Sequence, residues 1–160
     1  MKRAGRSRRA KVVFDEGTWF AVPLRSGGFA AGVVARTMPR GGVILVYFFR
    51  RLWDRPPSFD EVKGLKPQAA IQVMRVGDLG LVDGTWPVIG RDPDWHRDEW
   101  PCPRFLRRDE LSRRAWIVQY SDRDPNLVES ETPTSYDSKL EDNDLYGAGA
   151  AEIVLTKLLS

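Results

Sequence analysis

The sequence predicts an α+β domain dominated by a strongly bent, mostly antiparallel β-sheet with one or two short helices. A partly open SH3-like barrel is one form that such a sheet can take. The apolar runs are short, and turn residues such as Ser26-Gly27-Gly28 and Pro39-Arg40-Gly41-Gly42 separate them, as is typical of β-rich proteins. The length of 160 residues fits one domain with a core of its own.

Three strands are expected between residues 18 and 50. Thr18–Leu24 is rich in aromatic and apolar strand formers, and Pro23 indicates an edge strand or a bulge. Phe29–Arg36 follows a glycine turn, so these two segments are predicted to form a hairpin. Val43–Arg50 is almost continuously apolar, which indicates a strand with both faces covered.

A short helix is expected over Phe59–Gly64. Ser58 and Glu61 have the spacing of a capping box, in which each side chain accepts the backbone amide of the other residue. Glycine commonly ends a helix, so Gly64 is the predicted stop.

The second half of the chain is expected to form further short strands. Ala115–Tyr120 is the clearest of these, because Trp116, Val118 and Tyr120 alternate onto one face. The complete set of predicted strands is Ala70–Val76, Leu79–Val82, Trp86–Ile89, Arg104–Arg107 and Ala115–Tyr120.

Two later segments are less regular. Residues 122–144 contain eight carboxylates against two basic residues and are expected to be a loop. In Ala150–Leu159, the spacing of Ala151 and Leu155 fits a helix face, but several β-branched residues follow a glycine-rich stretch. Both structures remain open here, and the β-branched residues favour a strand.

The predicted core consists of apolar residues from the expected strands and from the C-terminal segment. Trp86 is expected to be half-buried beside the Pro87 turn. The expected core residues are Trp19, Phe20, Val22, Val33, Ile44, Val46, Phe48, Ile71, Val73, Leu81, Ile89, Ile117, Val118 and Leu155.

The positive charge of the chain is concentrated at its start. Residues 1–11 contain six basic residues and no acid, whereas the remainder has 19 basic and 22 acidic residues. We therefore predict a basic, disordered leader over residues 1–11 and a single domain over residues 12–160. A solvated terminus is favoured over nucleic-acid or membrane contact, because the body of the protein is not basic.

No catalytic residue is expected. Cys102 and His96 are the only cysteine and histidine, which excludes an internal disulfide and a multi-cysteine zinc site. A Cys–His pair would need an activated thiol. Pro101 and Pro103 flank Cys102 and predict a constrained, extended loop instead.

No metal and no cofactor is expected either. His96 with Asp92, Asp94 and Asp98 has no recognisable ligand spacing, and arginines lie among these acids. The glycines fit turns rather than a phosphate-binding loop. The longest apolar run, Val43–Phe49, is well short of the roughly 18 residues of a membrane span, and no secretory signal is present. No membrane partner and a cytoplasmic location are therefore expected.

The acidic tract is the strongest candidate for a functional surface. It reads either as a solvated loop or as a face for a basic protein partner. The candidate partner-binding residues are Asp137, Glu141, Asp142 and Asp144. A competing face is the loop of Trp95 and Trp100, whose aromatic rings would act as buried anchors.

Several segments, in their order and spacing, resemble the immunity protein 26 family. The resemblance covers about residues 15–159. The segments that carry it are Asp15–Leu24 (DEGTWFAVPL), Gly28–Arg36 (GFAAGVVAR), Gly77–Leu81 (GDLGL), Trp86–Gly90 (WPVIG), Asp124–Asn126 (DPN) and Leu145–Ile153 (LYGAGAAEI).

This resemblance implies a bacterial immunity protein that binds and neutralises a cognate polymorphic toxin by direct protein–protein interaction, and not an enzyme. It carries over no individual functional residue. Two alternatives remain open: a small phosphotriesterase-like hydrolase, a label that some related sequences carry, and a nucleic-acid-binding module driven by the leader. The sequence lacks a binuclear metal ligand set, and its body is not basic, so both alternatives rank below toxin binding.

Overall fold

The computed structural model of the chain describes residues 14–160. The predicted leader, residues 1–11, lies outside the described residues. The strands are β1 (Thr18–Pro23), β2 (Phe29–Thr37), β3 (Val43–Phe49), β4 (Ala70–Gly77), β5 (Val88–Arg91), β6 (Phe105–Asp109), β7 (Arg114–Ser121), β8 (Asp124–Thr134), β9 (Glu141–Asp142) and β10 (Leu145–Tyr146). The helices are α2 (Phe59–Val62), α3 (Leu79–Asp83) and α4 (Ala148–Leu159), with 3-10 turns η1 (Pro67–Ala69) and η2 (Arg97–Glu99).

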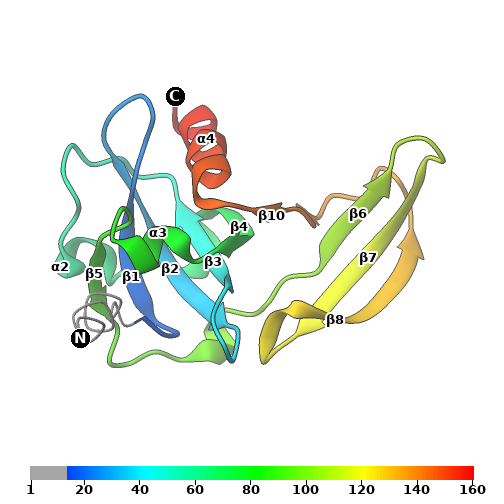
Figure 1. Cartoon of the computed structure of the whole chain (residues 1–160), viewed down its shortest axis with the longest axis horizontal. Coiled ribbons are helices and arrows are strands. Elements are labelled where there is room, and N and C mark those ends of the chain that lie inside the picture. The colour runs from blue at the N-terminus through cyan, green and yellow to red at the C-terminus, as the bar shows by residue number, and fades with distance from the viewer. Residues whose placement is uncertain (1–13) are drawn as a thin grey trace, which may run out of the picture.

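The strands form two sheets (Figure 1). The main sheet has the order β10-β4-β3-β2-β1-β5, and the outer sheet has the order β8-β7-β6-β9. Pairing is antiparallel except for β10 with β4 and β9 with β6. The predicted α+β class with a mostly antiparallel sheet is confirmed. The strands are divided between two sheets, however, and within residues 14–160 neither sheet closes into a barrel.

Strand β3 lies inside the main sheet, and all seven of its residues are buried. Its side chains alternate between two apolar clusters, with Ile44, Val46 and Phe48 on one face and Leu45, Tyr47 and Phe49 on the other. Burial on both faces explains why the segment reads as an unbroken apolar run. The expectation that both faces of this strand are covered is confirmed.

Most of the predicted core is confirmed, with three exceptions: Ile71, Ile89 and Ile117 are only partly buried. Trp86 is fully buried, so the half-buried position predicted for it is wrong. Its ring stacks on Phe20 with centroids 5.4 Å apart.

The strand predicted over Leu79–Val82 is wrong, because this segment forms α3. The carbonyl of Asp78 accepts the amides of Leu81 and Val82 at 3.0 Å, and Gly84 ends the helix with φ of 85°. The helix presses Gly80 against the ring of Trp86, where a Cβ would meet ring carbons at 2.7 Å. This tertiary contact has no signature in the short apolar run itself.

The strand favoured over Ala150–Leu159 is also wrong, because the segment belongs to α4. Ala151 and Leu155 lie one turn apart and are buried in the cluster that contains Trp86. Helical packing of this face outweighs the β preference of the neighbouring branched residues.

The acidic segment expected to be a loop instead contains β8, which pairs with β7 in an antiparallel hairpin. The strand forms the edge of the outer sheet, and residues 126–133 are all exposed. A strand exposed on both faces shows no alternation of apolar and polar residues, so the sequence pattern did not reveal it.

The remaining predicted elements are present with small changes of boundary. The predicted strands Trp86–Ile89 and Arg104–Arg107 are shifted toward the C-terminus as β5 and β6. In α2, the amide of Ser58 donates to Glu61 Oε1 at 2.9 Å, as a capping box requires.

Candidate partner-binding surface

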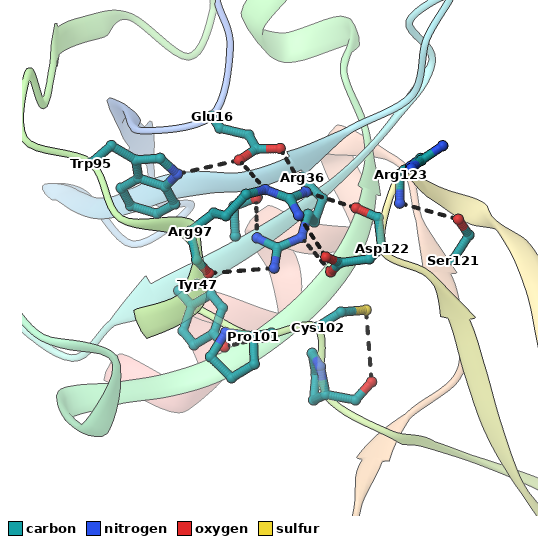
Figure 2. A network of polar contacts seen from close by, with 12 residues as sticks. Glu16, Arg36, Tyr47, Trp95, Arg97, Pro101, Cys102, Ser121, Asp122 and Arg123 are labelled. Carbon is teal, nitrogen blue, oxygen red and sulfur yellow. Dashed lines mark hydrogen bonds and ion pairs between the residues drawn. The ribbon is translucent and has the colours of Figure 1, made fainter.

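A polar network joins the outer sheet to the main sheet (Figure 2). Arg36 lies at the end of β2, and its side chain is 3% exposed. Its Nε donates to Asp122 Oδ1 at 2.9 Å, and its Nη1 donates to the carbonyl of Ala35 at 2.6 Å. Asp122 occupies the turn between β7 and β8, so this ion pair connects the two sheets.

Arg97, in η2, extends the network (Figure 2). Its Nε and Nη2 donate to the two oxygens of Glu16 at 2.9 and 3.0 Å, and its Nη1 donates to Asp122 Oδ2 at 2.5 Å. Burial raises the pKa of Asp122, but the hydrogen bonds and charges of Arg36 and Arg97 outweigh this effect and hold the pKa below its usual value. Two guanidinium groups thus face two carboxylates, and the charges of the network balance.

A second buried arginine fixes the junction at another point. Arg75, in β4, is 5% exposed and stacks over the ring of Tyr120 with 4.1 Å to the centroid. Its guanidinium donates to the carbonyls of Pro125 and Asn143 at 2.8 and 3.0 Å, and to Asn126 Oδ1 at 2.8 Å. Because Arg36 and Arg75 both reach the outer sheet from the main sheet, the outer sheet is held in a defined position.

Beyond this junction, the outer sheet carries an aromatic and ionic cluster in which Arg107 and Glu131 are exposed and Trp116 is partly buried. Arg107, in β6, stacks over the ring of Trp116, in β7, with 4.1 Å to the centroid. The same guanidinium donates from Nη2 to Glu131 Oε1, in β8, at 2.5 Å. The pairing registers place these three side chains on one face of the sheet, with Pro133 opposite Trp116. Tryptophan and arginine are the residue types that most often dominate protein interfaces.

The four candidate carboxylates lie in the segment after β8. Asp137, Asp142 and Asp144 are exposed, and Asp142 is 3.6 Å from Nη1 of Arg108. Glu141 is only partly exposed, and burial raises its pKa although a backbone hydrogen bond from Val73 opposes this effect.

A groove of about 480 Å³ brings two of these carboxylates together with the basic residues of β6. It is lined by Leu106, Arg107, Arg108, Glu110, Asp142, Asn143 and Asp144. Two of the candidate acidic residues, Glu141 and Asp142, form the end strand β9 of the outer sheet, and the neighbouring arginines of β6 offset part of the negative charge.

The aromatic candidates occupy a different environment. Trp100 is 5% exposed and contributes to the core, where it lies edge-on to Trp19. Trp95 stacks on Trp100 with centroids 5.2 Å apart and donates from Nε1 to Glu16 at 3.3 Å. In this conformation both rings pack inside the protein, so neither is available to insert into a pocket of a partner protein.

The thiol of Cys102 lacks the environment of a nucleophile. Burial raises its pKa to about 11, and its hydrogen bond to the Pro103 carbonyl spans 3.8 Å. His96 is exposed and lines a cavity of about 430 Å³ together with Trp19 and Trp100. Residues 14–160 contain no cluster of three or more His, Cys, Asp or Glu side chains able to hold a metal ion.

Among the described residues, none of the helices has both the length and the apolar character needed to cross a lipid bilayer.

The junction arginines and the Arg107–Trp116–Glu131 cluster were not predicted from the sequence. A signal for the first was available, because Arg36 and Arg75 interrupt apolar strands. A buried arginine requires acceptors for its donors, which implies partners from another element. The cluster had no such signal, since its members come from three strands whose register is set only by folding.

The sequence matches a known protein family. A family model described as immunity protein 26 matches residues 15–117, more than half of the chain. The matched range contains the resembling segments up to Trp86–Gly90, whereas those after residue 117 lie beyond it. Neither the comparison with curated proteins nor that with solved structures found a match.

Proposed function

Because the chain belongs to the immunity protein 26 family, we propose that it binds a cognate toxin directly and neutralises it within the bacterial cytoplasm. The partner is a protein toxin of the polymorphic class, and the inhibition is non-covalent. The toxin loses activity because its active surface is covered or held in an inactive form.

The observation that carries this proposal is the exposed outer sheet. Eight consecutive residues of β8, 126–133, are exposed. Arg107, Trp116 and Glu131 form one cluster on a face of the same sheet. A rigid sheet with an aromatic and arginine centre and a polar rim has the composition of a protein interface. The junction arginines hold this surface in place before binding, which lowers the entropic cost of association.

The acidic residues add a second charged feature to the outer sheet, away from β8. Asp142 lies in β9, at the opposite end of the sheet order from β8, and Asp137 and Asp144 are also exposed. Charges at the rim of an interface mainly accelerate association with a partner of opposite sign. A toxin that acts on nucleic acid would present the basic surface that such a rim attracts.

The direct test uses the chain and the toxin domain encoded beside it. The two purified proteins are mixed, and complex formation is followed by titration calorimetry while toxin activity is assayed in parallel. We expect a stoichiometric complex and loss of toxin activity at equimolar ratio. Absence of binding at micromolar concentration would contradict the proposal.

The two alternative functions are tested with the same preparation. Stoichiometric transition metal together with hydrolysis of paraoxon would indicate a phosphotriesterase-like hydrolase. Salt-dependent DNA binding that survives deletion of residues 1–11 would indicate a nucleic-acid-binding module.

A further inference from the structure

Strand β8 has one paired edge and one edge that no described strand occupies. It has 11 residues and lies at the end of the outer sheet order, with β7 on its inner side (Figure 1). A long edge strand presents a row of backbone donors and acceptors that can pair with another chain.

The pairing register shows which groups face outward. Trp116 lies opposite Pro133, and proline has no amide hydrogen, so this pair cannot exchange backbone hydrogen bonds. In an antiparallel ladder, bonded and non-bonded pairs alternate, which makes the Thr132 pair with Ile117 a bonded one. Glu131, two residues before Pro133, therefore directs its own amide and carbonyl away from β7 and toward the free edge.

The charge of β8 argues against self-association. The strand contains Asp124, Glu129 and Glu131 and no basic residue. If two copies paired antiparallel about Ser130, Glu129 of each copy would come close to Glu131 of the other. Like charges directly opposite each other destabilise a sheet. Arg107 offsets part of the charge on Glu131, but Glu129 forms no ion pair with any of the described residues.

The same charges favour a different occupant. An extended segment with a lysine or arginine opposite Glu131 would pair opposite charges, and Glu129, which lies at a bulge in the pairing with β7, adds negative charge nearby. Its backbone would satisfy the outward groups of Glu131 and the outward carbonyl of Pro133. Side chains on one face of such a segment would lie next to the cluster of Arg107, Trp116 and Glu131.

We propose that the cognate toxin adds a basic, extended segment to the free edge of β8 and becomes an additional strand of the outer sheet. This inference rests on the proposed function and specifies how the partner is held. Backbone pairing supplies the affinity, and the acidic side chains select the partner strand.

The first test compares two substitutions at one position. Glu131→Ala removes the carboxylate and its contact with Arg107 but keeps the outward amide. Glu131→Pro removes the carboxylate and the amide together, without removing a hydrogen bond to β7. We expect Glu131→Pro to weaken binding of the cognate toxin domain at least tenfold more than Glu131→Ala. Equal affinities of two folded variants would overturn the inference.

The second test requires no substitution, which keeps the inference testable if Glu131→Pro fails to fold. The outward amide of Glu131 should exchange its hydrogen rapidly in the free chain, whereas the amide of Thr132, bonded to Ile117, should exchange slowly. In the toxin complex, we expect the amide of Glu131 to become protected to a similar degree as that of Thr132.

The outcomes separate the inference from the function on which it rests. If the toxin domain binds but the Glu131 amide remains unprotected, strand addition is wrong and toxin binding stands. If the toxin domain does not bind, both are wrong. If the free chain is a dimer with a protected Glu131 amide, the free edge is occupied by a second copy, and the inference is also wrong.

Discussion

Arg36 of β2 and Asp122 of the β7–β8 turn form an ion pair with an Nε–Oδ1 distance of 2.9 Å across the junction of the two sheets. The arginine side chain is 3% exposed, whereas the aspartate side chain is 59% exposed. The exposed aspartate therefore compensates the charge of a buried arginine that lies 86 positions away in the sequence. This ion pair attaches the outer sheet, which we propose binds the toxin, to the main sheet.

Replacing Asp122 with Asn should destabilise the fold, because Arg36 would remain buried without its ionic partner. We expect a loss of about 1–3 kcal/mol in the free energy of unfolding at neutral pH. Asp60→Asn is the matched control, since Asp60 pairs with Lys63 at the surface with an 83% exposed side chain. Equal stability of the two variants in urea would show that the junction pair is not structurally important.

The same pair predicts a pH dependence. The folded-state pKa of Asp122 is below its ordinary value of 3.8, so ionised Asp122 contributes stability above pH 3.8. This contribution is lost as the pH falls through the folded-state pKa. The difference in unfolding free energy between the native protein and Asp122→Asn should therefore shrink as the pH falls below 3.8. A difference that is constant from neutral to acidic pH would contradict the assignment.

The close packing of α3 on Trp86 predicts a strong effect of one methyl group. In Gly80→Ala, the new Cβ would lie 2.7 Å from ring carbons of Trp86, and a buried ring in a packed core cannot move freely. We expect a loss of about 1–3 kcal/mol in stability. Gly64→Ala is the control, because no heavy atom lies within 4 Å of its added Cβ. Thermal unfolding of both variants measures the contrast.

Cys102 should be unreactive and dispensable. With a pKa of about 11, its thiolate fraction near neutral pH is about a hundredfold lower than that of a thiol with the ordinary pKa of 9.0. We expect slow alkylation by iodoacetamide in the folded state and fast alkylation in urea. Cys102→Ser should still protect cells against the cognate toxin. Loss of protection in a variant with unchanged thermal stability would assign a functional role to the thiol.

The acidic residues should act on the rate of association. Neutralising Asp137, Asp142 and Asp144 to Asn should slow binding of the cognate toxin and flatten its dependence on ionic strength. Glu141 is left unchanged because it is partly buried and its pKa is already raised. Asp54, Asp60 and Asp94, which are also exposed, provide a matched set of three neutralised carboxylates. Equal association rates for the two sets, measured by surface plasmon resonance, would exclude the acidic face.

Aromatic anchors should act on dissociation instead. Trp116→Ala removes the ring on which Arg107 stacks, so we expect faster dissociation of the toxin with a smaller change in association. Trp95→Ala tests the competing face, and its effect should appear in stability because Trp95 stacks on the buried Trp100. Faster toxin dissociation only in Trp95→Ala would favour the competing face.

Much of the main sheet could be predicted from the sequence. The segments that form β1 to β4 can be recognised as buried strands from their local apolar pattern. The unbroken apolar run of residues 43–49 also predicted that both faces of β3 are covered. The capping box at Ser58 and Glu61 is equally local. These features depend on residues close together in the chain, so their physical causes are visible in the sequence.

Tertiary structure decided the features on which the proposed function depends. The helical form of α4 follows from burial of Ala151 and Leu155 against residues far away in sequence, and α3 follows from contact with Trp86. Strand β8 owes its conformation to pairing with β7, and the Arg107–Trp116–Glu131 cluster owes its existence to the register of three strands. The stabilising energy of each such contact arises only when two distant segments meet, so the local sequence of one segment does not predict the contact.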